Sequence, residues 1–179
     1  MKKSTIEMEE NNIIKVKRLR EETKLPTYGS ELASGFDVRA YDCVMWDVNK
    51  NDLVSIQLST NGKGEKGWFI DDNTTVIFKT GLAMACGDHE EIQARARSGF
   101  SLKTPMRISN GIGTIDEDFR GEIGIIMDNN GFYGDWFVPY AERIAQLVIC
   151  PVIRPSILQV DDLDNTQRGE DGYGSTGTK

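Results

Sequence analysis

The sequence is short of the residues that build most metal and disulfide sites. Its 179 residues include one histidine, His89, and only three cysteines, Cys43, Cys86 and Cys150. A single histidine excludes any mechanism that needs two histidine ligands or a histidine pair. Three widely spaced cysteines favour neither a disulfide framework nor a zinc site. We therefore expect the cysteines to be free and to pack as small apolar residues.

Basic charge and long hydrophobic runs are also scarce. The chain carries 21 Lys and Arg against 28 Asp and Glu, a net charge of −7. Proteins that bind duplex DNA or RNA normally present a basic face, so we expect no nucleic-acid partner, although local arginines could still bind a small anion. No apolar run approaches the roughly 20 residues of a membrane span, and residues 1–12 are polar and acidic, unlike a secretory signal. The sequence thus predicts a cytoplasmic protein with no membrane partner.

The dominant pattern in the sequence is the alternation of apolar and polar residues with a period of two. It recurs at residues 14–17, 36–41, 54–58, 76–78, 92–97 and 122–125, between clusters of Gly, Asn and Asp, and residues 144–149 form an apolar run interrupted by one polar residue. Strands of this length and spacing are typical of an all-β sandwich or barrel. The helical period of 3.6 residues is sustained nowhere, and residues 101–107 could hold a turn or two of helix at most. We predict an all-β fold with no more than one short helix.

Two segments depart from this pattern. Residues 61–73 are polar and rich in glycine around an apolar centre at 68–70, which predicts a loop or a hairpin inserted between strands. Residues 161–179 are acidic and contain few apolar side chains, which predicts a flexible C-terminal arm. We therefore expect one β domain over residues 1–160, with the insertion at 61–73, followed by the arm.

The segment 113–122 has the sequence of a β-hairpin with acidic residues near its tip. Glycines bracket three acidic residues between apolar runs. Acidic residues in such a turn are usually exposed to solvent and have no further function. Asp116 differs because it directly follows the apolar Ile115, and a carboxylate that points inward must be desolvated, paired or functional. As a general base it could take a proton from water.

Three further features could bind an anion. Arg97 is followed by Ser98 and Gly99, which together offer a guanidinium, a hydroxyl and a backbone that a ligand can approach closely. Gln146 is a lone polar residue inside an apolar run, so its amide needs a backbone or ligand partner. A third feature lies near the C-terminus, where glycines, hydroxyls, a basic residue and one aromatic ring are similar to a phosphate cradle without being a Walker sequence: Arg168, Tyr173, Gly174, Ser175 and Thr176.

Taken together, these segments resemble the five ordered motifs of the trimeric dUTPases (deoxyuridine triphosphate nucleotidohydrolases). The motifs are matched, in the family's order, at residues 33–40, 96–101, 110–124, 142–148 and 168–177. They read ASGFDVRA, ARSGFS, NGIGTIDEDFRGEIG, ERIAQLV and RGEDGYGSTG. One such match would be weak, but five in order over most of the chain are specific.

The resemblance implies a jelly-roll-like β fold, a homotrimer with shared active sites, and hydrolysis of dUTP to dUMP and pyrophosphate with Mg²⁺. Such an activity limits uracil in DNA and supplies dUMP for dTMP synthesis. In the family, the aspartate that matches Asp116 activates the water that attacks the α-phosphorus. The carboxylate that matches Asp37 reaches the Mg²⁺ ion through water, while the substrate phosphates supply most of its ligands.

The resemblance also implies substrate-binding roles. The uracil and deoxyribose would contact Asn110, Gly113, Thr114, Ile115, Phe119 and Tyr173. The phosphates would contact Arg97, Ser98, Gly99, Gln146, Arg168, Gly174, Ser175 and Thr176. The ring of Phe119 would leave no room for a ribose 2′-OH, and Tyr173 would stack on uracil when the arm closes over the active site of a neighbouring subunit.

Several positions depart from the family's pattern and leave alternatives open. Phe119 and Tyr173 exchange the family's usual Tyr and Phe, and Ala96 stands where many members have Pro. The span before Arg97 is longer than is typical, and the excess maps to residues 61–73, a candidate surface for an additional protein partner. One alternative function is a nucleotide-gated regulatory module with the same fold. Another is a dCTP deaminase or a bifunctional relative, which would need an acid or base near C4 of cytosine.

Overall fold

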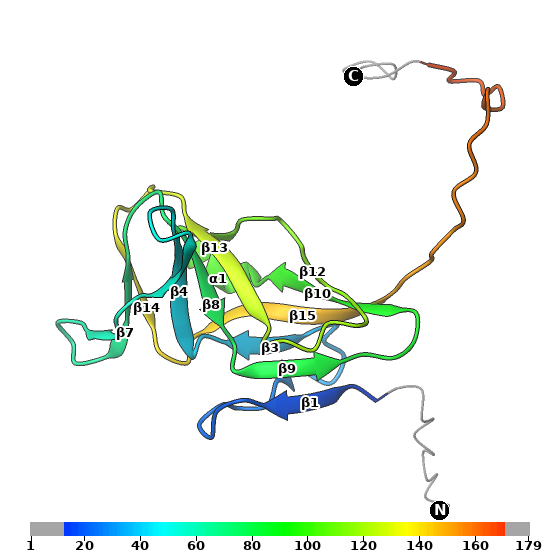
Figure 1. Cartoon of the computed structure of the whole chain (residues 1–179). Helices are drawn as coiled ribbons and strands as arrows, with labels where there is room; N and C mark the ends of the chain where they lie inside the picture. The colour runs from blue at the N-terminus through cyan, green and yellow to red at the C-terminus, as the bar shows by residue number, and fades with distance from the viewer. Residues whose placement is uncertain (1–12, 171–179) are drawn as a thin grey trace, which may run out of the picture.

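Strands make up almost all of the regular structure. The computed structural model describes residues 13–170, and in this range all strand pairings are antiparallel. The strands are β1 (Lys15–Arg18), β2 (Thr27–Tyr28), β3 (Phe36–Arg39), β4 (Asp42–Asp47), β5 (Asp52–Ser55), β6 (Ser59–Thr60), β7 (Lys66–Ile70), β8 (Thr75–Lys79), β9 (Leu82–Ala85), β10 (Glu90–Ala96), β11 (Met106–Ile108), β12 (Gly113–Ile115), β13 (Gly124–Asn129), β14 (Trp136–Pro139) and β15 (Arg143–Pro151). One helix, α1 (Ser98–Lys103), follows β10 (Figure 1). The prediction of an all-β fold with one short helix is confirmed, and no helix in the part of the chain that the structure describes is long and apolar enough to cross a membrane.

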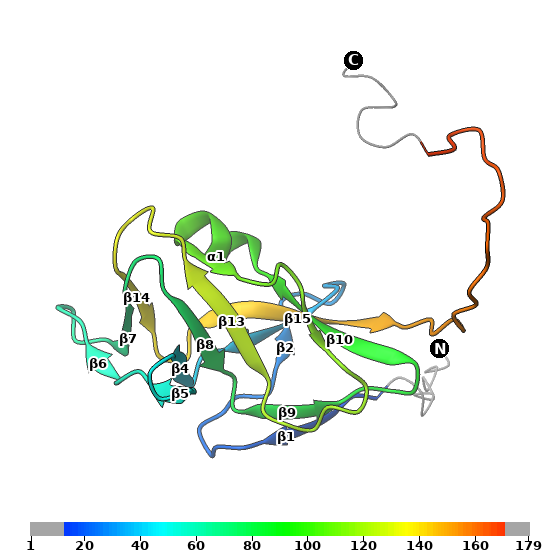
Figure 2. The same cartoon turned by 45° about the horizontal axis from the view of Figure 1, so that its top comes forward.

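Two five-stranded sheets form the body of the domain (Figures 1 and 2). One has the strand order β12-β10-β15-β3-β2 and the other β11-β13-β8-β4-β5, while β14-β7-β6 and β1-β9 form two smaller sheets. The alternation predicted from the sequence is realised in the core, since Val76 and Phe78 of β8 and Ile125 and Met127 of β13 are all buried. Burial of these side chains between the sheets provides the main favourable free energy of folding.

The period of two did not reveal every strand. Leu82, Ala83 and Met84 of β9 are all buried, so this strand shows no alternation at all. The strand predicted at 54–58 exists with other bounds, because β5 covers Asp52–Ser55 and residues 56–58 lie outside any strand. The turn before β5 sets this register: the Asp47 carboxylate accepts a hydrogen bond of 2.9 Å from the Asn49 N–H, and Asn51 has φ 52°.

The helix begins and ends earlier than the sequence analysis predicted. Residues 101–107 were the expected position, whereas α1 spans Ser98–Lys103. Thr104 is extended (φ −131°, ψ 159°), as expected for a residue that precedes a proline, here Pro105. The proline therefore ends the helix and allows β11 to begin at Met106.

The segment at 61–73 contains the turn between β6 and β7 and the whole of β7, and it contributes to the core. Asn61 holds the turn, because its Oδ1 accepts hydrogen bonds from the N–H groups of Lys63 (2.9 Å) and Glu65 (3.0 Å). Beyond the turn, β7 pairs with β14, and Trp68 is only 2% exposed. Only residues 61–65 form a polar turn, because residues 66–70 are a strand that packs in the core.

The hairpin predicted over 113–122 is not formed. β12 pairs with β10 in one sheet, and the loop at 116–123 leads to β13 in the other sheet. The far end of this loop is anchored on β9, because the Ile123 N–H donates to the Leu82 carbonyl (2.8 Å) and the Ile123 side chain is buried. The loop thus crosses between sheets instead of folding back on β12.

Burial makes one of the three free cysteines unreactive. Cys43 is fully buried, and burial raises the pKa of its thiol to about 12. Because the thiolate is the nucleophile, a raised pKa keeps the thiol protonated and inert at mildly alkaline pH. We expect Cys43 in the folded protein to be alkylated by iodoacetamide more slowly than Cys86 and Cys150, which are half-buried. Mass spectrometry of the digested protein measures this, and a Cys43 that reacts as fast in the folded protein as in urea would contradict it.

Candidate functional site

An aspartate held by two arginines lies at the meeting point of three elements. Asp37 of β3 accepts a hydrogen bond at Oδ1 from Arg97 Nε (2.8 Å) and one at Oδ2 from Arg143 Nη1 (3.0 Å). Arg97 Nη1 also donates to the Arg143 carbonyl (2.8 Å). The Asp37 side chain is 17% exposed, so these contacts are only partly screened by water. This Asp37 cluster ties β3, β15 and the end of β10 together and carries more positive than negative charge.

Gln146 lies beside the cluster in the middle of its sheet. It sits on β15 opposite Asp37 of β3 and Arg95 of β10. Its Nε2 donates to the Ala96 carbonyl (2.9 Å), so the backbone satisfies the amide N–H. At position 35 a Cβ would lie 2.8 Å from the Leu147 carbonyl and 3.2 Å from Gln146 Oε1, so Gly35 allows the chain to pass this close to the amide.

The first turn of α1 presents its backbone next to Arg97. Ser98 and Gly99 are exposed, and a Cβ at position 99 would meet no atom within 4 Å. The first N–H groups of a helix have no partner within the helix. Arg97, Ser98 and Gly99 therefore place a guanidinium, a hydroxyl and accessible backbone at one spot, as the sequence analysis required for anion binding.

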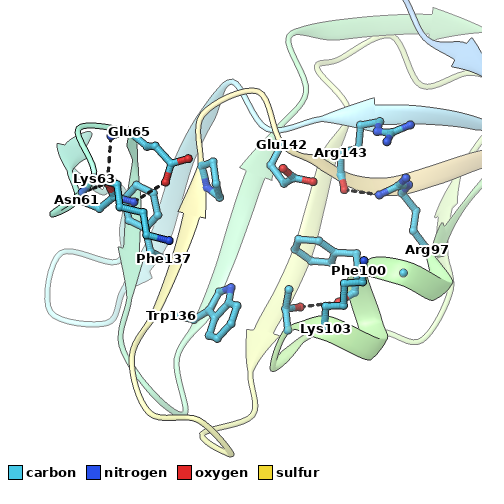
Figure 3. A pocket seen from close by; sticks show the side chains of 13 residues that line it. Asn61, Lys63, Glu65, Arg97, Phe100, Lys103, Trp136, Phe137, Glu142 and Arg143 are labelled. Carbon is cyan, nitrogen blue, oxygen red and sulfur yellow. Dashed lines mark hydrogen bonds between the residues drawn. The ribbon is translucent and has the colours of Figure 1, made fainter.

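A pocket of about 510 Å³ adjoins the Asp37 cluster (Figure 3). We call it the hairpin pocket, since the turn at 61–65 forms one side of it and α1 the other, with Trp136 and Phe137 of β14 between them. Arg97 and Arg143 belong to its wall. The hairpin pocket is therefore continuous with the residues that the sequence analysis assigned to phosphate.

A second, smaller pocket lies on β12. Its volume is about 110 Å³, and four of the predicted substrate-binding residues line it: Asn110, Gly113, Thr114 and Ile115. A Cβ at position 113 would lie 3.2 Å from the Cβ of Ala94, a tight contact, so glycine suits the close pairing of β12 with β10. The structure thus brings together the backbone groups expected to contact a base.

The Asp116 side chain is exposed, which contradicts the expectation of an inward carboxylate. The reason is that β12 ends at Ile115, so Asp116 starts the crossing loop. Phe119, 42% exposed, lies over Gly121, where a Cβ would come within 2.6 Å of its ring. The neighbouring Glu117 carboxyl has a lowered pKa, because Arg154 donates a hydrogen bond to it and the His89 N–H points at it.

The two groups of residues do not meet within one chain. Ile115 lies opposite Ile92 near the start of β10, and Arg97 follows its end. Five residues of strand separate Ile92 from Arg97, or about 16 Å at ~3.3 Å per residue. After Ile115 the chain runs on to Asp116 in the direction that leads away from Arg97. One chain alone therefore does not bring Asp116 to the Asp37 cluster.

The chain after β15 contacts the crossing loop near its start, where Arg154 pairs with Glu117 (2.8 Å), and then leaves the domain (Figures 1 and 2). Residues 152–170 join no sheet, and both views show them, in orange to red, running away from the sandwich (Figures 1 and 2). Arg168 lies on this exposed segment. The remaining arm candidates, Tyr173, Gly174, Ser175 and Thr176, lie outside the described residues.

Sequence reasoning did not single out Arg143. A β-bulge between Arg143 and Ala145 breaks the alternation, so a period of two could not predict which way Arg143 points. Lys63, Lys103 and Trp136 of the hairpin pocket were also missed, because separate elements bring them together and no local pattern signals it. Among residues 13–170, no group of three or more His, Cys, Asp or Glu could hold a metal ion by itself.

Comparisons with known proteins identify the family of the chain. A family model described as dUTPase matches residues 65–177. The deoxyuridine 5′-triphosphate nucleotidohydrolase of Alkaliphilus metalliredigens is 38% identical over 93% of this chain and 98% of its own. That of Syntrophotalea carbinolica is 39% identical over 92% and 96%.

The fold agrees as well. A dUTPase of Staphylococcus bacteriophage 80alpha, a mutant solved with dUpNHpp, superposes with a TM-score of 0.74 over 93% of this chain and 99% of its own, at 23% identity. The fold is therefore the jelly roll of these enzymes. The relatives at 38% and 39% identity and the matching model together show that the chain belongs to the dUTPase family.

Proposed function

We propose that the protein is a dUTP diphosphatase, which hydrolyses dUTP to dUMP and pyrophosphate and so limits uracil in DNA and supplies dUMP for dTMP synthesis. The observation that carries the proposal is the small pocket on β12, which Gly113, Thr114 and Ile115 line and which the exposed carboxylate of Asp116 follows directly in the chain. The names of the curated relatives support the same substrate.

The proposed chemistry is attack of water on the α-phosphorus. Asp116 takes a proton from the water, a bond forms between its oxygen and the α-phosphorus, and the bond to the bridging oxygen breaks as pyrophosphate leaves. Arg97, Ser98, Gly99 and Gln146 bind the phosphates, and the positive Asp37 cluster stabilises the charge that develops on them. Arg168, Gly174, Ser175 and Thr176 add phosphate contacts when the arm closes, and Tyr173 covers the base.

A Mg²⁺ ion fits the donors that are present. Both Asp37 oxygens accept hydrogen bonds from arginines, so this carboxylate would reach the ion through water, and phosphate oxygens would supply most of the other ligands. Bound in this way, Mg²⁺ would neutralise phosphate charge. In the related dUTPase of phage phi11, a structural Mg(II) ion is coordinated.

Selectivity for dUTP follows from the size and the groups of the β12 pocket. A volume of about 110 Å³ leaves little space for the methyl group of thymine. Backbone donors and acceptors arranged for uracil leave unpaired groups when cytosine binds, which is costly in a buried site. Phe119 under the sugar excludes a ribose 2′-OH.

The decisive test is the release of pyrophosphate from dUTP, dCTP, dTTP and UTP, measured together with ammonia from dCTP. Release from dUTP alone supports the proposal. Ammonia from dCTP would instead identify a deaminase or a bifunctional relative. Retained dUTP binding without release from any nucleotide would favour the second candidate, a nucleotide-gated regulatory module whose protein partner contacts residues 61–73.

We further propose that the active protein is a homotrimer whose sites are shared between subunits. The separation of Asp116 from the Asp37 cluster within one chain supports this, because a neighbour's loop at 116–123 would have to complete each site. The segment after β15 offers a second support: Ile153 and Ile157 are 89% and 99% exposed, which is costly unless another subunit covers them.

Mixing two inactive variants tests the shared site. Asp116→Asn and Arg97→Gln chains are each expected to be inactive as pure proteins. After refolding of a 1:1 mixture, about a quarter of the shared sites combine an intact Arg97 with an intact Asp116 from a different chain, so activity returns to about that fraction of the wild type. Pyrophosphate release measures it, with each variant refolded alone as the control. A mixture as inactive as its components would place both residues of one site in the same chain.

A further inference from the structure

The hairpin pocket carries positive charge, and two of its cations, Lys63 and Lys103, lie outside all five motifs. Four cationic side chains line it, Lys63, Lys103, Arg97 and Arg143, against two carboxylates, Glu65 and Glu142. The whole chain has a net charge of −7, so this concentration of cations is local. Figure 3 shows that Lys63 and Lys103 come from opposite sides, the first from the hairpin turn and the second from α1.

The two lysines are available for a ligand. Among residues 13–170, Lys63 and Lys103 form no ion pair, and both are exposed. The Glu65 carboxylate accepts a hydrogen bond of 2.8 Å from Asn61 Nδ2, and the Asn61 Oδ1 accepts the Lys63 N–H. The backbone that carries Lys63 is therefore fixed by the turn before any ligand binds, which lowers the entropic cost of binding.

Aromatic side chains form the floor of the hairpin pocket. The Phe137 ring lies 4.9 Å from that of Phe69, and the Trp136 ring lies 6.0 Å from that of Tyr133, so neighbouring rings hold both in place. A volume of about 510 Å³ is within the usual range for sites that bind small organic molecules. Flat apolar surface next to cations suits a ligand with both a planar ring and an anionic group.

We propose that the hairpin pocket binds a nucleoside phosphate as a second ligand, with its phosphates against Lys63 and Lys103 and its base against Trp136 or Phe137. This site goes beyond the proposed function, whose base-binding pocket lies on β12. Because Arg97 lines the hairpin pocket and also belongs to the proposed phosphate site, two anions compete for it. A nucleotide in the hairpin pocket therefore weakens dUTP binding and acts as an inhibitor that raises KM.

The probe for this site is dATP, used with a matched pair of double variants. Lys63→Gln with Lys103→Gln removes the two cations of the pocket, whereas Lys66→Gln with Lys24→Gln removes two exposed cations that do not line it. Calorimetry measures dATP binding, and pyrophosphate release measures how dATP changes KM for dUTP. We expect the first variant to bind dATP about tenfold more weakly and to escape inhibition, with kcat and KM for dUTP alone close to the wild type. The control variant keeps both responses.

Four outcomes would overturn the proposal in whole or in part. Absence of dATP binding to the wild type overturns it, as does inhibition that persists in the Lys63 and Lys103 variant, since dATP then occupies the dUTP site itself. Equal loss in the control variant shows a general charge effect. Inorganic tripolyphosphate that binds as tightly as dATP removes the role of the aromatic floor. Failure of the proposed function is distinguishable, because dATP binding that depends on Lys63 needs no hydrolysis of dUTP.

Discussion

Replacing Asp116 with Asn is expected to lower kcat for dUTP roughly 10²–10⁴-fold, the usual contribution of a general base. Asparagine has the same shape as aspartate but cannot take a proton from water. The side chain is exposed, and substitutions at such positions usually change stability by no more than about 0.5 kcal/mol. The variant should therefore fold, assemble and bind dUTP as the wild type does. Initial rates of pyrophosphate release at saturating dUTP give kcat, and titration with dUTP gives the affinity.

Asp118→Asn is the matched control for this variant. Asp118 lies in the same loop, is exposed and loses the same charge on substitution. If Asp116 acts as the base, the Asp118 variant keeps kcat within about twofold, because this substitution changes only the electrostatic field around the loop. Equal losses of kcat in the two variants would show that Asp116 acts only as one of several charges in the loop. A rise in KM with an unchanged kcat for Asp116→Asn would give it a binding role instead.

The fold was predictable where one face of a strand is buried and the other is exposed to solvent. β8 and β13 show the alternation directly, whereas β9 is buried along Leu82–Met84 and looks like any apolar run. Long-range contacts determine the course of the chain where the alternation gives no signal. The loop at 116–123 crosses between sheets because Glu122 and Ile123 are held on the β9 side, where Glu122 accepts the Gly81 N–H (2.8 Å), and no hairpin signal contains that long-range contact.

The candidate site was predictable in its composition but not in its arrangement. The motifs named Asp37, Arg97 and Gln146, and the structure gathers them on neighbouring strands through the pairing of β3, β15 and β10. Arg143 joins them only because of a bulge. Lys63 and Lys103 are far apart in sequence and share a pocket because the hairpin turn, β14 and α1 come together in the fold. Such a pocket is a property of the tertiary structure, and neither the hydrophobic period of the sequence nor its composition can reveal it.

Removing residues 168–179 is expected to abolish turnover while the trimer stays intact. The truncation takes away Arg168 and the glycine-rich end that we propose to bind phosphate and cover the base. Closure of such a segment positions the substrate and excludes water, so its loss should lower kcat/KM on the order of 10²-fold or more. Pyrophosphate release measures turnover, and light scattering measures the mass of the assembly.

The assembly should survive because the truncated chain still ends beyond its exposed apolar residues. Residues 152–167 remain, including Ile153 and Ile157, which we propose to be covered by another subunit. The 17 residues from Pro151 to Arg168 reach up to about 55 Å when extended, far enough to cross a neighbouring domain of this size. Deleting only residues 178–179, which follow the last motif, is the matched control and should leave activity unchanged. A truncated protein that dissociates or unfolds would show that the end of the arm holds the trimer together, and one that retains full turnover would show that the site works without a cover.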